Sequence, residues 1–436
     1  MRRYTVYTDG KKSAIGSLRP DEHEAELRLI KLYPQYTDQH WEGFGGAATE
    51  SAAYTWSLMD PLQRQELIDA YFSPEGLNYS VVRVPLDSCD FSIAEYEAAP
   101  GGDLSRFDTG RSLQYILPML RAIREVKKDI SLLLSPWSPP AAFKSNGKRQ
   151  HGGKCLPEHW EDWAEYLCRY VKEFSDLGFR VFGITLQNEP HAVQTWDSCL
   201  WTGEEEREFL IRHVRPALDR NGFKEVGIYI WDHNKERVLD RALTELAGEG
   251  AGAAAGVAFH WYSGDHFDAL RQLHRLFPEH KLMLSEHCLG TEVGAKNERS
   301  GRNKIAHELW GDLESGMNYA FDWNILLDEQ GGPNYVDNFC HAPYRYDRGA
   351  GLLARQGIYD AYWHFAHFLA PGDVRILSSS FDSAQVEATA FRKPDGAIVL
   401  VLRNAGQDAD AAVSLDGQLA ALRLPADSLL TVVIEG

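Results

Sequence analysis

The sequence predicts an α/β protein, a (β/α)8 TIM barrel with a side antiparallel β-sandwich. Across residues 41–372, short apolar or β-branched runs alternate with longer amphipathic stretches. From residue 373 onward the pattern changes to short alternating runs, which are typical of antiparallel strands. The chain has 436 residues, of which 44% are hydrophobic, so it can bury both a barrel core and a second apolar layer.

Eight runs predict the parallel strands of the barrel. Each run is bounded by Gly, Pro or polar residues, and the regular alternation with helices predicts a closed sheet. The runs cover residues 41–47, 79–86, 130–137, 181–189, 226–232, 256–262, 281–287 and 318–324. The glycine-rich segment 43–46 lacks the Lys and Ser/Thr of a phosphate-binding loop, so we interpret it as a turn after the first strand.

Helices are predicted between these runs. Asp60 precedes Pro61 and an apolar spacing of three and four residues, which indicates an N-cap followed by a proline in the first turn. The same amphipathic pattern occurs at 112–128, 159–178 and 203–222, and the last two stretches end in glycine, as helices commonly do.

Three segments are expected. Residues 41–372 form the catalytic barrel and residues 373–436 form the C-terminal sandwich, in which Pro394-Asp395-Gly396 marks a turn. Residues 1–40 fit neither a barrel nor a helix bundle. We expect them to contribute strands to the sandwich and so bring the chain ends together.

Composition restricts the partners. The chain has 45 Lys+Arg and 63 Asp+Glu, a net charge of −18, which disfavours nucleic acid and anionic membranes. No apolar stretch is long enough to cross a membrane, and the N-terminus lacks the apolar run of a secretory signal. The six cysteines are scattered without a CxxC pair, so we expect reduced thiols in a cytoplasmic protein.

Two glutamates occupy the positions where barrel enzymes carry their chemistry. Glu189 ends the fourth run and Glu286 lies near the end of the seventh. An ionised Glu after a buried run is costly unless water or a partner reaches it, so a framework ion pair with Arg is one interpretation. The fourth and seventh strands lie on opposite sides of a barrel, however, and two carboxylates across a pocket are what glycoside hydrolysis requires.

A set of short motifs follows in order along the chain. They are Gly43-Phe44-Gly45-Gly46-Ala47, Arg83-Val84-Pro85, Ser88-Cys89-Asp90-Phe91-Ser92, Ser135-Pro136-Trp137, Asn188-Glu189-Pro190, His260-Trp261-Tyr262, Ser285-Glu286, Asp322-Trp323-Asn324 and Gly331-Gly332-Pro333-Asn334. With this set the sequence resembles glycoside hydrolase family 30, the glucosylceramidase-like retaining β-glycosidases, over nearly its whole length. The resemblance also implies a barrel with a side sandwich built from both chain ends.

The resemblance implies roles for the residues at the strand ends. Glu189 would be the general acid/base and Glu286 the nucleophile, and we expect burial and the nearby Glu286 to raise the pKa of Glu189. Asn188 matches the residue that hydrogen-bonds the sugar 2-hydroxyl, and Arg83 matches a basic residue that holds Glu286 ionised.

Further matches concern the sugar. Asp90, Trp137 and Trp323 correspond to contacts with the non-reducing-end sugar, where a carboxylate can accept from two hydroxyls and an indole can offer its N–H or its face. Tyr262 is placed to hydrogen-bond Glu286. Asn338 matches another sugar contact more loosely.

Other residues receive no role from the sequence. Asp232 and His233 end the fifth run and are expected to line the pocket. The basic loop 144–154 either meets an acidic group of the substrate or is simply solvated. The segment with Trp196 and Trp201 follows Glu189 and is expected to border the aglycone.

We therefore expect a retaining β-glycosidase acting on β-glucosides or related sugars, supplied as a small glycoside or oligosaccharide. An endo-β-1,6-glucanase or a β-xylosidase or β-fucosidase on the same scaffold is the alternative, and a non-catalytic sugar-binding barrel is a remote one. No cofactor is expected, and the strand-end residues Asp232, His260 and His287 form no spaced metal-ligand set. The sequence leaves open the sugar, the linkage, exo or endo action and the oligomeric state.

Overall fold

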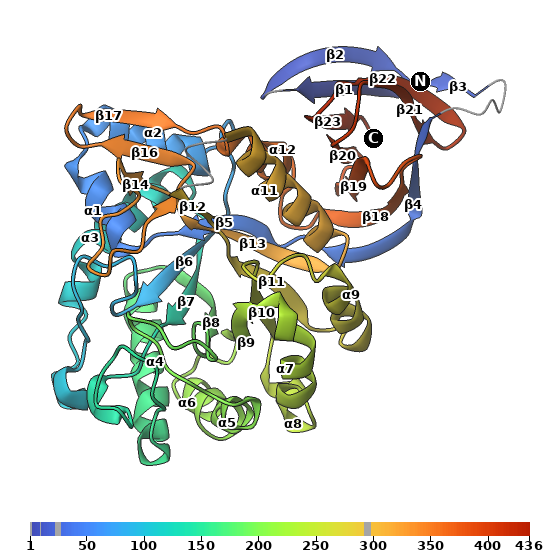
Figure 1. Cartoon of the computed structure of the whole chain (residues 1–436). Helices are drawn as coiled ribbons and strands as arrows, with labels where there is room; N and C mark the ends of the chain where they lie inside the picture. The colour runs from blue at the N-terminus through green and yellow to red at the C-terminus, as the bar shows by residue number, and fades with distance from the viewer. Residues whose placement is uncertain (1, 9, 22–27, 292–297) are drawn as a thin grey trace.

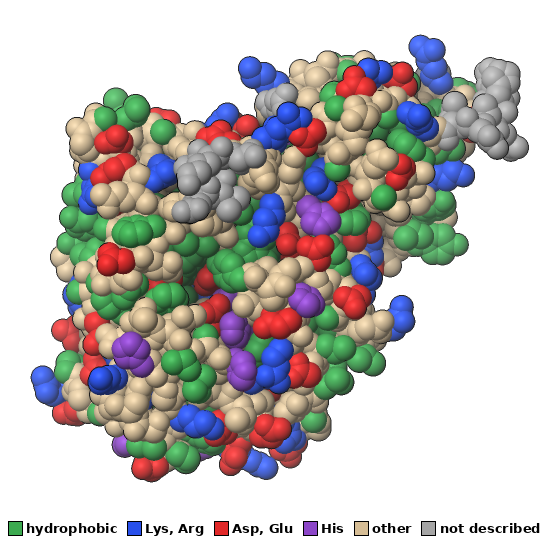
Figure 2. Space-filling view, in the orientation of Figure 1, with side chains coloured by type: hydrophobic (Ala, Val, Ile, Leu, Met, Phe, Trp, Pro, Cys, Tyr) green, Lys and Arg blue, Asp and Glu red, His purple; other side chains and the backbone are tan. Residues whose placement is uncertain are grey.

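The computed structural model describes residues 2–8, 10–21, 28–291 and 298–436. It consists of a barrel and a second, β-rich part that lies to one side and contains both chain ends (Figure 1). Within the described residues, no helix is both long enough and apolar enough to cross a membrane. Figure 2 shows acidic and basic side chains interspersed over the visible face.

Eight parallel strands close into the barrel in the order β10-β11-β13-β5-β6-β7-β8-β9. Each predicted run forms one of them, so the predicted fold class is confirmed. The strands are β5 (Gly43–Ala47), β6 (Val81–Leu86), β7 (Ser131–Pro136), β8 (Arg180–Thr185), β9 (Gly227–Asn234), β10 (Gly256–His260), β11 (Lys281–Glu286) and β13 (Met317–Asn324). Their carboxyl ends meet at one end of the barrel, which positions the site described below.

The glycine-rich segment 43–46 is not a turn, and that interpretation is wrong. It is strand β5 itself, paired with β6 on one side and β13 on the other. A Cβ atom on Gly45 would come within 2.2 Å of the Val81 carbonyl oxygen. The glycine is therefore needed because the two strands approach too closely for a side chain.

Helices surround the barrel, and all four predicted stretches are helical. The predicted helix at 203–222 is divided into α5 and α6 by a π-helical turn at Leu210–Val214. Asp60 caps α2 by accepting from the backbone N–H groups of Leu62 and Gln63, and Gly178 and Gly222, at φ +83° and +84°, follow α4 and α6. The helices are α1 (Glu50–Leu58), α2 (Pro61–Phe72), α3 (Gly110–Val126), α4 (Trp160–Asp176), α5 (Gly203–Phe209), α6 (Arg215–Arg220), α7 (Val238–Glu245), α8 (Glu249–Ala253), α9 (Phe267–Leu276), α11 (Glu298–Leu313) and α12 (Tyr359–Ala366).

The second part is a ten-stranded sheet in the order β2-β1-β23-β20-β19-β18-β4-β21-β22-β3. The sheet folds over on itself. Strands β1 and β22 lie far apart in this order, yet the Tyr4 hydroxyl of β1 donates to the Ala421 carbonyl of β22 at 3.2 Å. Its strands are β1 (Arg3–Thr8), β2 (Lys11–Ser17), β3 (Arg19–Pro20), β4 (Leu29–His40), β18 (Val374–Ser379), β19 (Val386–Arg392), β20 (Ile398–Asn404), β21 (Ala409–Leu415), β22 (Gln418–Leu424) and β23 (Ser428–Ile434).

Both chain ends therefore build the sandwich, as the sequence predicts. All of its ladders are antiparallel except the one between β4 and β21. The sandwich is fastened to the barrel by polar side chains, among them His364 of α12, whose ring contacts the Thr431 hydroxyl of β23 at 2.9 Å. Arg375 of β18 pairs with Asp38 and Glu314.

Two small sheets extend the chain beyond the ends of β11 and β13. One joins β12 to β15, and the other joins β14, β16 and β17. Their bounds are β12 (Leu289–Gly290), β14 (Leu327–Asp328), β15 (Cys340–His341), β16 (Tyr344–Asp347) and β17 (Leu352–Arg355). The described cysteines are all free thiols.

The close approach at Gly45 leads to a stability prediction. Gly45→Ala should cost about 1–3 kcal/mol, because the new methyl group overlaps a strand carbonyl that cannot move away cheaply, and the thermal midpoint followed by circular dichroism at a fixed scan rate should fall. Gly252→Ala is the matched control, because a Cβ atom there meets nothing within 4 Å. Equal midpoints for the two variants would contradict the assignment.

Candidate active site

A cavity of about 280 Å³ lies at the carboxyl ends of the barrel strands. Every residue to which the sequence analysis gave a role in catalysis or sugar binding lines it, except Arg83, which lies beneath it. Of the two residues expected to line the pocket without a role, His233 lines it and Asp232 does not. The predicted lining residues are Asp90, Trp137, Asn188, Glu189, Tyr262, Glu286, Trp323 and Asn338. The structure adds Gln194, Asn234, Cys288 and Cys340, and it brings in Trp196 from the segment expected to border the aglycone.

Glu286 is the last residue of β11, and both of its carboxylate oxygens are held. Arg83 donates from Nη1 to Oε2 at 2.7 Å, and the Tyr262 hydroxyl donates to Oε1 at 3.0 Å. Burial raises the pKa of Glu286, and the charge of Glu189 adds to this, while the charges of His260 and Arg83 oppose it; the net shift is upward. The sequence-based pairing of Arg83 and Tyr262 with Glu286 is present in the structure.

Arg83 makes further contacts beneath the cavity. Its side chain is completely buried on β6, and Nη2 donates to the side-chain oxygen of Asn188 and to Asp232, each at 2.9 Å. Its guanidinium carbon lies 4.8 Å from the ring centroid of Trp137 and 5.3 Å from that of Trp323. The guanidinium therefore fixes the orientation of the Asn188 amide as well as the Glu286 carboxylate.

Asp232 differs from its predicted place in the pocket lining. It does not line the cavity but lies below it, fully buried. Besides Arg83, it accepts from the Ser285 hydroxyl at 2.5 Å and contacts His260 Nε2 at 3.1 Å. Burial by itself raises the pKa of Asp232. The charge of Arg83 and these hydrogen bonds outweigh burial and hold that pKa far below its usual range.

Glu189 lies four residues beyond β8 in a left-handed backbone conformation, with φ +48°. Its backbone N–H donates to the Asp232 carbonyl at 3.0 Å, which ties the turn to the end of β9. Its Oε1 lies 3.2 Å from Nδ1 of His260, and Nδ1 of His233 lies 3.5 Å from the same oxygen.

The protonation of this pair differs from the sequence-based expectation. Burial raises the pKa of Glu189, but the hydrogen bond and charge of His260 and the charge of His233 outweigh burial, so the pKa is lowered. Burial would also lower the pKa of His260, but Glu286, Asp232 and Glu189 together raise it to about 9. The expected rise for Glu189 is therefore wrong for the resting protein, because the sequence does not show that an imidazolium lies beside it.

The residues expected to contact the sugar form a second group. Asn338 donates to Asp90 Oδ2 at 2.9 Å, and Oδ1 of Asp90 is buried without a hydrogen-bond partner among the described residues. Burial and the charges of Glu286 and Glu189 raise the pKa of Asp90 well above its usual value. Trp137 and Trp323 stack on each other at 5.2 Å between ring centroids, so one face of each indole is covered by the other indole.

Glu189, His233 and His260 offer potential metal-ligand atoms within 4.8 Å of one another. Both ring nitrogens of His260, however, are engaged by carboxylates, at Glu189 and Asp232. The pKa of about 9 also places a proton on His260 at neutral pH, and a metal would have to displace that proton. The arrangement is therefore suited to proton exchange.

The sequence places Asp232 and His260 at strand ends but assigns neither of them a role in the reaction. Both are polar residues at the carboxyl ends of otherwise apolar runs, as Glu189 and Glu286 are. Such a pattern places a residue at the top of the barrel, but it does not tell which strand ends face each other. Cys288 and Cys340 had no signal; their sulfur atoms lie 3.3 Å apart in the cavity wall.

The basic loop 144–154 is not a simply solvated loop. Lys144 and Arg149 are 3% and 2% exposed, and each is hydrogen-bonded. Lys154 pairs with Glu205 at 2.6 Å. The alternative, in which these charges meet an acidic substrate, is not supported by this placement, because they are directed at the protein itself.

Comparison with known proteins agrees with this geometry. The mouse (Mus musculus) lysosomal acid glucosylceramidase is 30% identical over 94% of this chain and 84% of the relative. An endo-1,6-beta-D-glucanase of Neurospora crassa is 25% identical over 89% of this chain and 84% of the relative. The crystal structure of SrfJ from Salmonella typhimurium superposes with a TM-score of 0.95 at 34% identity, covering 100% of this chain and 99% of that one.

The family comparison covers both parts of the molecule. Residues 41–369 match the glycosyl hydrolase family 30 TIM-barrel domain, and residues 372–432 match the family's beta-sandwich domain. With its glucosylceramidase relative, its closed barrel and its carboxylate-lined cavity, the chain belongs to glycosyl hydrolase family 30 and is a glycoside hydrolase.

Proposed function

We propose that the protein is a retaining β-glycosidase in which Glu286 is the nucleophile and Glu189 the general acid/base. The observation that carries the proposal is the unequal surroundings of the two carboxylates. Glu286 is paired with the permanently charged Arg83 at 2.7 Å, which suits an anion that attacks carbon. Glu189 lies 3.2 Å from His260, a group that can hold or release a proton.

The two charges are coupled. The negative charge of Glu189 raises the pKa of Glu286, so moving a proton onto Glu189 removes this repulsion and favours the anion of Glu286. The proton on His260 lies along the contact between Nδ1 and the Glu189 carboxylate, and the fully buried imidazolium cannot reach a substrate itself. Glu189 is thus the group that presents the proton of the pair to the cavity.

The reaction proceeds in two displacements. In the first, Glu189 donates its proton to the glycosidic oxygen, the bond from that oxygen to the anomeric carbon breaks, and a Glu286 oxygen bonds to the anomeric carbon. In the second, Glu189 removes a proton from water, the water oxygen bonds to the anomeric carbon, and the ester to Glu286 breaks. Two inversions leave the product in the β configuration.

A glucose-type sugar is the proposed substrate unit. Asp90 has an unpartnered buried oxygen that can accept from a sugar hydroxyl, and Asn338 orients the other oxygen. The mouse relative is named a glucosylceramidase, which supports a β-glucoside. The Neurospora crassa relative is named an endo-1,6-beta-D-glucanase, which supports that activity as the second candidate. A β-xylosidase or β-fucosidase remains an alternative, and a sugar-binding barrel without activity a remote one.

The two glutamates can be separated by azide rescue. Glu286→Gly should lower activity on a dinitrophenyl glycoside by several orders of magnitude, and azide should enter the vacated face to give an α-glycosyl azide. Glu189→Ala should still form the glycosyl-enzyme, because this leaving group needs little protonation, and azide should then give the β-glycosyl azide. Proton NMR of the adducts distinguishes them; interchanged anomers would mean interchanged roles.

The sugar is tested with nitrophenyl β-glycosides of glucose, xylose, fucose, galactose and glucuronic acid. The glucoside should have the highest kcat/KM. A β-1,6-linked glucan separates exo from endo action, because exo action releases only monosaccharide at early times. Oligosaccharides as the first products, with the polymer preferred over the aryl glucoside, would establish the endo-glucanase instead. If no substrate of the panel is hydrolysed, a sugar-binding barrel without activity is the interpretation that remains.

The pH profile depends on His260. Its pKa of about 9 predicts that the pair loses its proton above that pH, so kcat/KM on a phenyl glycoside, whose leaving group needs protonation, should fall there. In His260→Asn the proton must reside on Glu189 alone, and the alkaline limb should move to lower pH. His213→Asn is the matched control, because His213 also faces a carboxylate, Glu161, at 3.1 Å but outside the barrel. An unmoved limb in His260→Asn would contradict the shared proton.

A further inference from the structure

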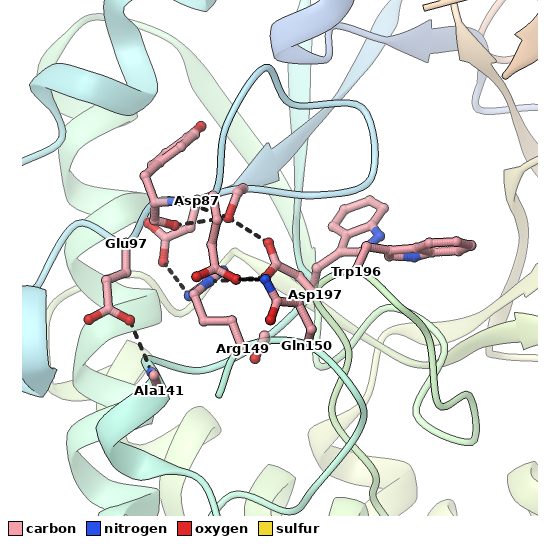
Figure 3. A network of polar contacts seen from close by, with 12 residues as sticks. Asp87, Glu97, Ala141, Arg149, Gln150, Trp196 and Asp197 are labelled. Atoms are coloured by element: carbon pink, nitrogen blue, oxygen red, sulfur yellow. Dashed lines mark hydrogen bonds and ion pairs between the residues drawn. The ribbon is translucent and has the colours of Figure 1, made fainter. Parts of the chain in front are cut away.

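Arg149, Asp87 and Asp197 belong to a network of polar contacts (Figure 3). The network adjoins the cavity lining at Trp196 and does not include the groups that handle the proton. At its centre, Arg149 is 2% exposed, with Nε 3.2 Å from Asp197 and Nη1 3.4 Å from Asp87. Asp87 directly follows β6, Arg149 lies on the basic loop after β7, and Asp197 lies on the segment after Glu189. One guanidinium therefore joins the chain beyond three successive barrel strands.

Both carboxylates of the network have additional donors. Asp87 accepts from the hydroxyls of Tyr166 and Tyr170 and from the Ala98 backbone N–H, and Asp197 accepts from the Ser88 hydroxyl. Burial raises the pKa of both Asp87 and Asp197, and the charge of Arg149 opposes it. Losing Arg149 would leave two buried carboxylates without their cation, so the attached loops would have to move or take in water.

The two loops that this ion pair joins are also hydrogen-bonded to each other along their length. The loop containing Arg149 and the segment containing Trp196 exchange backbone hydrogen bonds, and Lys144 ties them further by donating to the carbonyls of Arg149 and Ser198. The backbone bonds run from Ser198 to Arg149 at 3.0 Å, from His151 to Gln194 at 2.8 Å and from Leu200 to Gly153 at 2.7 Å. The two segments therefore form one unit whose anchor is Arg149.

This unit carries part of the cavity wall. Gln194 and Trp196 both line the cavity, and Trp196 immediately precedes Asp197. Trp196 is partly buried and packs against the cluster that includes Trp137 and Trp323. Since Glu189 protonates the leaving-group oxygen in the proposed mechanism, we place the segment that follows Glu189 on the side of the leaving group.

We propose that Trp196 binds the leaving group, whether an aglycone or a further sugar, and that Arg149 is the positioning residue that holds it there. This inference rests on the proposed glycosidase function. The side chain of Trp196 offers an apolar, flat surface to a ring of the leaving group. Arg149 acts only through the loop, by keeping Asp197 and hence Trp196 against the cavity.

The test compares two substrates with the same sugar, a nitrophenyl β-glucoside and β-glucosyl fluoride. Fluoride is too small to contact Trp196, so it reports the sugar site and the two glutamates alone. In Trp196→Ala, kcat/KM for the nitrophenyl glucoside should fall about tenfold, while that for the fluoride should change less than about twofold. Arg149→Met should show the same selective loss, and Arg149→Lys a smaller one.

The matched control is Arg375→Met. Arg375 is also a buried arginine paired with two carboxylates, Asp38 and Glu314, but it lies at the sandwich. Its loss should lower thermal stability and leave the ratio of the two kcat/KM values unchanged. All rates are normalised to the active enzyme titrated with a fluorosugar inactivator, so a folding defect alone does not alter the ratio.

Each outcome decides the proposal. An unchanged ratio in Trp196→Ala removes the binding role, and a selective loss in Trp196→Ala but not in Arg149→Met removes the positioning role. If Arg149→Met does not fold, Arg149→Lys carries the test, because its single ammonium cannot span both carboxylates, and an unchanged ratio there overturns the role. Failure of the unaltered protein to hydrolyse either substrate would refute the glycosidase function itself, which is a different result.

Discussion

The ion pair between Arg83 and Asp232 is the interaction on which the candidate active site depends. Its atoms are 2.9 Å apart and neither side chain is exposed. Arg83 reaches Glu286 and Asn188, while Asp232 reaches His260, whose other ring nitrogen faces Glu189. Removing one partner of such a pair leaves a buried charge and typically costs about 3–5 kcal/mol. The two candidate catalytic carboxylates thus belong to one network, and the state of one affects the other.

The barrel holds this network with an unusual backbone. Glu189, Trp231 and Asp232 all have left-handed conformations, with φ of +48°, +72° and +50°. Residues other than glycine rarely adopt such angles, and they do so mainly where the surrounding structure imposes them for function. Here the turn at Glu189 is tied to the end of β9 by the hydrogen bond from Glu189 N–H to the Asp232 carbonyl. The packed strands below supply the rigidity that such conformations require.

The cavity is built by two different means. Its inner part comes from residues at or next to strand ends, such as Trp137 and Glu286, and these are held by the closed barrel. Its outer part comes from segments beyond the strands, such as the one with Gln194 and Trp196, and these are held by the separate network around Arg149. The inner and outer parts are therefore held by separate sets of interactions. Such a division is consistent with relatives on this scaffold that carry different substrate names.

The sequence by itself determined the fold class, and its resemblance to the family supplied most of the residues at the cavity. Strand periodicity placed all eight barrel strands, and position at a strand end was enough to place Glu286 at the top of the barrel. The helix cap at Asp60 and the glycines after α4 and α6 could also be predicted from the sequence, because these signals act within a few residues. The misinterpreted segment 43–46 shows the limit, since glycine marks a close strand contact and a turn alike.

Only the tertiary structure decided which of these residues act on each other. Barrel closure brings His260 of β10 beside Glu189, which lowers the pKa of Glu189 where the sequence suggested a rise. It likewise buries Arg149 between Asp87 and Asp197, although the sequence predicts that the basic loop is either solvated or directed at an acidic substrate. The physical reason is the same in both cases: local sequence sets periodicity and caps, whereas a charge responds to every group within a few ångströms, and those groups come from segments far apart in the chain.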